Sequence, residues 1–286
     1  MISFFFKLFS VLLIFLGFSS LLEALDTPLI LVSVAPHKFF VEKIAGDTVK
    51  VQLMVPAGAS SHTYEPTPRQ MMTASDAVIW FIIGESFEKR AIQALQSHKP
   101  LLQMINLQQG LDLIETSHHH GKGCCPGHVD LHFWLSARQA QIQAETIAQA
   151  LMKNYPEQAD LYRRNLQVFQ QELQVLDQEI TAILEPLKNR NILVSHPAYG
   201  YFCRDYHLTQ YAIEVEGKDP TPQQMTRLLT QVKTAGVKAI YIQVQYNNKA
   251  AKLVAETLNL RLVTLDPYAE QYMATMREIA HAFSEG

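Results

Sequence analysis

The sequence predicts an α/β protein with two lobes, each a small, mostly parallel sheet flanked by helices, joined by one long rigid helix. Strand-like apolar runs alternate with helix-like segments in both halves of the chain, and a single amphipathic stretch lies between the halves. One helix-capping motif also occurs in each half. The expected parts are a signal peptide at 1–24, an N-terminal lobe at 25–154 with a His-rich loop at 115–130, a linking helix at 155–187 and a C-terminal lobe at 188–286.

The first residues form a long apolar run with one positive charge, Lys7, followed by small and then polar residues. This pattern is typical of a secretory signal peptide. A transmembrane anchor is the alternative, because the run is near the length that spans a bilayer. No cysteine directly follows the run, so a bacterial lipid anchor is not expected. We therefore expect an exported, periplasmic protein.

Runs rich in β-branched and aromatic residues predict buried parallel strands. In the first half the predicted strands lie at 29–34, 49–55, 77–83 and, more briefly, 101–105. Helical sequence separates them, as at 39–45 and 69–74. The second half repeats the plan with strands at 191–195, 238–243 and 260–265. Strands that alternate with helices in this way predict an open α/β sheet in each half.

A short motif supports two similar halves. EPTPRQM at 65–71 recurs as DPTPQQM at 219–225. In each copy Thr is a candidate N-cap, the next Pro occupies the first helical position, and Gln at the third can close a capping box. Internal duplication and two independent helix starts both explain the pattern, because capping boxes recur widely.

Between the halves, apolar residues recur at alternating steps of four and three. They are Tyr162, Leu166, Phe169, Leu173, Leu176, Ile180, Ile183 and Leu187. This spacing predicts one long amphipathic helix with a single apolar stripe. Pro156 fits its start and Pro186 its end. A coiled coil would need a partner and more repeats, so we interpret the stretch as a helix that lies along both halves.

Composition excludes some classes of protein. The formal net charge of -3 argues against nucleic acid as a partner. Three cysteines, Cys124, Cys125 and Cys203, are too few for a disulfide scaffold. The first two are adjacent and would strain the backbone if they paired with each other.

Four residues are candidate metal ligands: His62, His132, His196 and Asp266. Each follows an apolar, strand-like run and precedes a helix start. Open α/β sheets bind ligands at the carboxyl ends of their strands. Three imidazoles and one carboxylate make a complete set for a zinc-like cation. Taken singly, each histidine has an ordinary alternative as a surface or packed residue, and Asp266 could simply cap a helix.

Other polar residues lie near these candidates in the sequence. Asp130 is a possible hydrogen-bond acceptor behind His132, and Glu65 is interpreted as a loop or second-shell group. The segment from Glu115 to Asp130 is rich in glycine and in metal-binding side chains: His118, His119, His120, Cys124, Cys125 and His128. It predicts a mobile loop that captures metal ahead of the main site, and an accidental polar loop is the alternative.

At this point the residues resemble a family, the metal-binding substrate-binding proteins of bacterial ABC importers for zinc and manganese, and within it the zinc-uptake (ZnuA-like) branch. The four motifs are SHTYEPTP at 61–68, HFWLS at 132–136, SHPAYGYF at 195–202 and VTLDPYAE at 263–270. They occur in the family's order, and the resemblance covers nearly the whole mature chain. Leu131 and Ser136 depart from the Pro and Asp usual there, and Ser61 replaces the Glu of some zinc members.

The resemblance implies two α/β lobes joined by a long helix, a metal site in the interlobe cleft, and delivery of the ion to a membrane permease. The manganese branch usually has Glu where this chain has His196, so the resemblance favours Zn²⁺, with Mn²⁺ or Fe²⁺ as alternatives. A zinc hydrolase is a competing class, with Glu65, Glu214 or Glu216 as a spare base, although no HExxH motif occurs. A zinc-stabilised surface adhesin is a third. We expect a carrier, not an enzyme, and a monomer.

Overall fold

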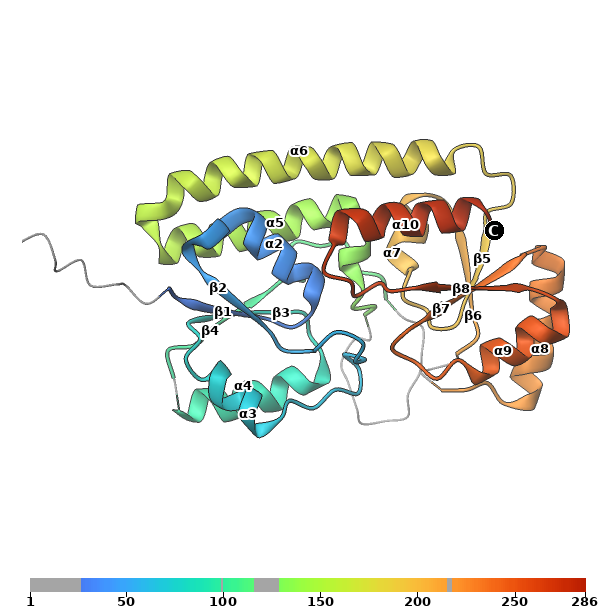
Figure 1. Ribbon diagram of the computed structural model, residues 1–286, viewed down its shortest axis with the longest axis horizontal. Helices are drawn as coiled ribbons and strands as arrows, with labels where there is room; N and C mark the ends of the chain where they lie inside the picture. Colours follow the sequence, from blue (N-terminus) through green and yellow to red (C-terminus); the bar gives the residue numbers. More distant parts are fainter. Residues whose placement is uncertain (1–26, 99, 116–128, 215–217) are drawn as a thin grey trace, which may run out of the picture.

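A computed structural model describes residues 27–286 except 99, 116–128 and 215–217. Within this part of the chain, two four-stranded parallel sheets lie side by side beneath one long helix (Figure 1). The predicted fold class is therefore confirmed. The predicted signal peptide falls outside the described residues. None of the described helices has both the length and the apolar character that a membrane crossing needs.

The first sheet has the strand order β2-β1-β3-β4, with every neighbouring pair parallel. Its strands are β1 (Leu29–Val32), β2 (Lys50–Leu53), β3 (Ile79–Ile82) and β4 (Gln103–Asn106). The helices of this half are α2 (Ala35–Ala45), α3 (Pro68–Ala74), α4 (Ser86–His98) and α5 (Ala137–Asn154). Short 3₁₀ turns lie at η1 (Gly46–Thr48), η2 (Phe133–Leu135) and η3 (Pro156–Gln158).

The second sheet repeats this topology, with the order β6-β5-β7-β8 and parallel pairs throughout. Its strands are β5 (Asn191–Val194), β6 (Thr209–Ala212), β7 (Ala239–Gln243) and β8 (Arg261–Leu265). Its helices are α7 (Gly200–Asp205), α8 (Pro222–Ala235), α9 (Lys249–Leu258) and α10 (Tyr272–Ser284). Strand β6 is absent from the sequence prediction. It is an edge strand with one exposed and three half-buried residues, so it lacks a continuous apolar run.

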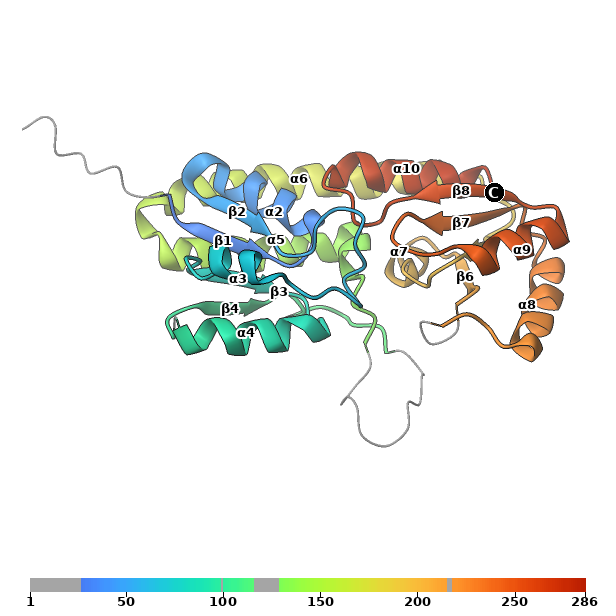
Figure 2. The ribbon, with the colours of Figure 1, turned by 60° about the horizontal axis from the view of Figure 1, so that its bottom comes forward.

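Both faces of each sheet are buried, which explains the near-continuous apolar strands. In the first sheet Leu31 and Trp80 point into a core shared with α3 and α4, whereas Ile30 and Phe81 belong to a second core on the other face. That second core continues under both sheets and includes the buried side of the long helix. Figure 2 shows α3 and α4 on the side of the first sheet that faces away from this helix.

The long helix α6 (Ala159–Leu184) has 26 residues and spans both sheets (Figure 1). Its buried residues are Tyr162, Leu166, Phe169, Leu173, Leu176, Ile180 and Leu184. The predicted stripe is therefore buried, although Leu184 takes the place of Ile183 at its last turn. Because its apolar stripe is buried along the whole length of the helix, α6 is a rigid element that packs against both halves.

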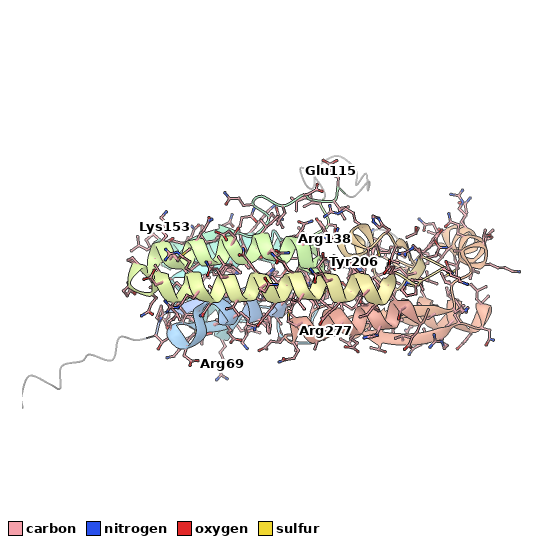
Figure 3. All side chains as sticks on the ribbon, turned by 90° about the horizontal axis from the view of Figure 1, so that it is seen from above. Arg69, Glu115, Arg138, Lys153, Tyr206 and Arg277 are labelled. Carbon is pink, nitrogen blue, oxygen red and sulfur yellow. The ribbon has the colours of Figure 1, made fainter. Side chains whose placement is uncertain are left out.

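Polar contacts also join α6 to both halves. Arg138 on α5 pairs with Asp177, which accepts a hydrogen bond of 2.9 Å from the Tyr206 hydroxyl. Arg277 on α10 pairs with Glu179 at 2.7 Å. Viewed from above, Arg138, Tyr206 and Arg277 lie beside the C-terminal half of α6 (Figure 3). Asp177 thus receives one partner from each half of the molecule.

Both predicted capping boxes are present. Thr67 caps α3 and Thr221 caps α8, and in return each threonine backbone N–H donates to the side chain of the glutamine three residues later. Ser136 caps α5 by accepting from the Gln139 backbone, but the Gln139 side chain donates to the Asp112 carbonyl instead of closing a box. Cys203 is a buried free thiol whose pKa is raised by burial. Cys124 and Cys125 lie outside the described residues.

Candidate metal centre

Three of the four candidate ligands converge. Each of His62, His132 and His196 offers a ring nitrogen, and these nitrogens lie within 4.8 Å of one another. The three ring centroids are 5.2–5.3 Å apart in pairs. Two nitrogens bound to one zinc ion at about 2.0–2.1 Å lie about 3.4 Å apart, so small ring movements bring this set to bonding geometry.

The three histidines reach this point from different connections. His62 lies in the connection between β2 and α3, here called the His62 loop (residues 54–67). His132 directly precedes the 3₁₀ turn η2, and His196 follows β5 by two residues. The expected strand-exit position is thus found for His196. His132 instead follows an isolated β-bridge between Glu115 and Val129 and not a strand, and the apolar residues after it form η2.

Each imidazole has its own carboxylate partner at Nδ1. The pairs are His132–Asp130 at 2.7 Å, His196–Glu214 at 2.7 Å and His62–Glu85 at 3.0 Å. A carboxylate accepts the Nδ1 proton, which orients the ring and leaves the Nε2 lone pair for an ion. Three such pairs pointing to one place are the arrangement of a metal site with its supporting shell.

The surroundings of His196 keep its imidazole neutral, which is the form that binds a metal ion. Burial lowers its pKa to about 4, against the opposing effect of the Glu214 hydrogen bond. Its Nε2 is buried and has no hydrogen-bond partner among the described residues. An unpaired buried nitrogen is costly unless something binds it, and a cation would do so.

His62 has the opposite electrostatics. Burial lowers its pKa, but the hydrogen bond and charge of Glu85, together with the charges of Asp130 and Glu214, outweigh this and raise it. His62 reciprocally lowers the pKa of Glu85, although burial opposes that shift. The ring therefore holds its proton to a higher pH than a free imidazole, and an arriving cation must displace it.

Asp130 has the position that the sequence analysis predicts for it. Its Oδ1 accepts from both the Nδ1 and the backbone nitrogen of His132, the latter at 2.9 Å. Its carbonyl accepts from the Tyr201 hydroxyl at 2.7 Å. Gly200 lies against the same carboxylate, where an added Cβ would be 2.7 Å from Oδ2. A side chain at residue 200 would therefore push Asp130 away from His132.

Asp266 lies outside the three-histidine cluster. It directly follows β8, as predicted, but its Oδ1 accepts from Gln245 Nε2 at 2.6 Å and from the Tyr268 backbone nitrogen at 3.0 Å. Its role as fourth ligand stays a prediction. The Tyr268 hydroxyl instead lies 3.1 Å from His132 Nε2.

Of the two positions predicted for Glu65, in a loop or behind a metal ligand, the structure shows the loop. Its side chain is 62% exposed and forms an ion pair with Arg90. The carboxylate behind His62 is Glu85, which the sequence analysis does not single out. His118, His119, His120 and His128 lie outside the described residues, so the predicted capture loop is not described here.

Four residues were not predicted as neighbours of the histidines, although Glu214 was named as a possible spare base; all four follow strands. Glu85 and Glu214 each come two or three residues after a strand, β3 and β6, where an α/β sheet gathers its functional groups. Tyr246 and Tyr268 likewise follow β7 and β8 and contact the site. The polar residues just beyond the predicted strands therefore include Glu85, Tyr246 and Tyr268, whereas Glu214 follows the unpredicted strand β6.

Comparison with known proteins agrees with this geometry. Residues 30–286 match the ZnuA family, described as "Zinc-uptake complex component A periplasmic". A Chlamydia muridarum protein whose name describes metal binding is 34% identical over 259 residues, covering 90% of each chain. A ZnuA crystal structure superposes with a TM-score of 0.85 at 33% identity, covering 91% of this chain and 99% of the other.

A zinc-bound ZnuA deletion mutant is also similar, with a TM-score of 0.83 and 34% identity over 91% of this chain and 97% of the other. The fold thus coincides with that of solved relatives over 91% of this chain. This chain belongs to the ZnuA family, the metal-binding, substrate-binding components of ABC importers.

Proposed function

We propose that this protein binds zinc outside the cytoplasm through His62, His132 and His196 and passes it to the membrane permease of an ABC importer. The observation that carries the proposal is the set of three imidazoles, each oriented by a carboxylate at Nδ1. Proteins of this family are substrate-binding components of transporters and not enzymes, so the site holds cargo.

Zinc is the cargo that the donor set favours. Three nitrogen ligands suit zinc better than manganese, which prefers oxygen and binds any given site more weakly. The family name and the zinc-bound relative support the same choice. Closed zinc sites are tetrahedral, so a fourth ligand is needed. We assign it to Asp266, whose side chain would exchange its bond with Gln245 for the ion.

The remaining expectations belong to the same proposal. We infer export by a signal peptide at 1–24 and a periplasmic location, in keeping with the family description. We divide the mature protein into lobes at 25–154 and 188–286 with a linking segment at 155–187, which is supported by one sheet before α6 and one after it in the sequence. We assign His118, His119, His120 and His128 to an accessory loop that captures zinc weakly.

Metal competition tests the proposal. Untagged protein incubated with equimolar zinc and excess manganese, then desalted, should retain about one zinc per chain by elemental analysis. A His62→Ala/His132→Ala/His196→Ala variant should retain none, and His281→Ala, which removes an exposed histidine on α10, should match the parent protein. Retention of manganese in place of zinc would overturn the assignment of the cargo.

The accessory loop needs a separate measurement. Deletion of residues 118–120 should leave one tight zinc site in calorimetry and remove weaker additional binding, because ligands on a loop that the glycine-rich sequence predicts to be mobile lose conformational entropy when they bind. Loss of the tight site would place these histidines in the primary shell. Unchanged total stoichiometry would leave them no metal role.

A further inference from the structure

The two sides of the metal centre are attached to the second half of the molecule in very different ways. The His132 side is tied by several buried bonds. The Trp134 indole donates to the Pro267 carbonyl at 2.9 Å, and the Tyr272 hydroxyl donates to the Trp134 carbonyl at 2.8 Å. The Tyr201 hydroxyl donates to the Asp130 carbonyl at 2.7 Å. His132 and His196 therefore keep their relative positions.

The His62 loop meets the second half through two neighbouring serines. Ser60 Oγ donates to the Tyr246 hydroxyl at 3.2 Å, and Ser61 Oγ lies 3.1 Å from the Tyr268 hydroxyl. Both serines are at most 9% exposed, and they directly precede His62. Two tyrosine hydroxyls of the C-terminal half thus lie against the backbone that carries one proposed metal ligand of the N-terminal half.

Both tyrosines also contact the other two histidines. The Tyr246 ring stacks on His196 with centroids 4.5 Å apart and planes 19° from parallel. The Tyr268 hydroxyl lies 3.1 Å from His132 Nε2, and its ring packs against Trp134 at 5.1 Å. Each tyrosine therefore links the His62 loop to a histidine on the fixed side of the site.

Hydrogen-bond capacity settles the direction of these contacts. His132 gives its Nδ1 proton to Asp130, so Nε2 accepts, and Tyr268 donates to it. Ser61 gives its single proton to Glu85 Oε1 at 2.6 Å. When Nε2 binds an ion, Tyr268 loses that acceptor but still faces the Ser61 oxygen, to which its proton can turn.

We propose that Tyr246 and Tyr268 form a two-point latch on the His62 loop and that the latch sets the rate at which the site releases its metal. This rests on the proposed function, with zinc as the cargo. Release begins when the loop lifts His62 from the ion, because the bonds around Trp134 hold the other side in place. Both tyrosines are positioning residues: their hydroxyl groups hold Ser60 and Ser61, and through them His62.

The test is zinc release in stopped flow, with a chelator in excess and the full-length mature protein. Tyr246→Phe and Tyr268→Phe keep the ring contacts and remove the hydroxyl groups. Each should release zinc about 3- to 10-fold faster, as expected for the loss of one neutral hydrogen bond. Tyr241→Phe is the matched control, because it removes a 2.7 Å hydroxyl bond to the Ala282 carbonyl, away from the three histidines.

A double-variant cycle separates the latch from general loosening. Ser60→Ala should accelerate release as much as Tyr246→Phe, and the two together should do no more than either alone. Thermal unfolding of the metal-free variants should follow that of the Tyr241→Phe control.

Release rates within twofold of the parent protein for both tyrosine variants would overturn the latch. So would additive effects of Ser60→Ala and Tyr246→Phe, since Tyr246 would then act by another route. If the parent protein binds no zinc, the proposed function fails instead, and the two failures are distinguishable.

Discussion

The proposed metal site has two parts, a fixed side with His132 and His196 and the His62 loop. They differ in burial and in the bonds that hold them. His132 and His196 have side chains that are 5% and 8% exposed, whereas that of His62 is 31% exposed. The fixed side is bonded through Trp134, Tyr272 and Tyr201, and the loop through two serine hydroxyls. A carrier must bind tightly and still release its cargo. The difference supports the proposed latch, in which tight geometry and release belong to separate parts of one site.

Ligand removal should show the contrast most strongly. His196→Ala should weaken zinc binding more than about 100-fold, beyond the 10- to 100-fold typical of losing a second-shell partner. His62→Ala should also be severe but smaller, because water can reach that position. Chelator competition measures both, with His281→Ala as control. Equal losses at the two positions would contradict a division into a fixed and a yielding side.

The supporting carboxylates should differ in the same sense. Glu214→Gln should weaken zinc binding about 10-fold or more, because it removes the charge that holds a buried imidazole. Glu85→Gln should cost less, because His62 is more exposed. Glu65→Gln, at an exposed ion pair, should leave affinity unchanged. The same chelator titration checks all three, and a larger effect at Glu85 than at Glu214 would reverse the comparison.

The pH dependence should come mainly from the loop. The pKa of His62 is raised, so as pH falls through that value a proton competes for the ring and zinc affinity falls, by up to about tenfold per pH unit. The pKa of His196 is about 4, so it stays neutral from pH 8 to pH 5 and adds nothing there. Glu85→Gln should move the fall to lower pH. Affinity flat between pH 8 and pH 5.5 in the parent protein would contradict this.

The smallest change is expected in overall shape. Helix α6 packs against both halves along its buried stripe, and bending it would break backbone hydrogen bonds. Loading should therefore move the His62 loop and leave the lobes nearly in place. Small-angle scattering of metal-free and zinc-loaded protein should give superimposable curves. A clear difference in the radius of gyration would contradict this and would indicate that metal is released by a hinge motion between the lobes.

Most of the fold could be predicted from local sequence patterns. Buried strands, the long helix and both capping boxes depend on nearby residues, so their spacing predicts them. Strand β6 was not predicted, because an edge strand needs no continuous apolar run. His196 and Asp266 were placed correctly at strand ends. His132 was expected at the end of a strand, but it follows only an isolated β-bridge at Val129.

The carboxylates and tyrosines that contact the three histidines could not be predicted from the sequence in the same way. Glu85 and Glu214 are 23 and 18 residues from their histidines, and pairs at such separations are set by the packing of strands. Asp130 was predictable because it is two residues from His132. Tyr246 and Tyr268 are farther still from the serines that they contact, 186 and 207 residues away.

The indole of Trp134 gives this protein a built-in optical signal. It is fully buried, 5.4 Å from the His132 ring and in contact with Tyr268. The other of the two tryptophans, Trp80, lies in the separate core beneath the first sheet. Near-ultraviolet emission from Trp134 should therefore change when an ion draws His132 away from the phenol, while Trp80 supplies a constant background. Loading and unloading are then visible without a dye, and a Trp80→Phe variant should show the larger fractional change.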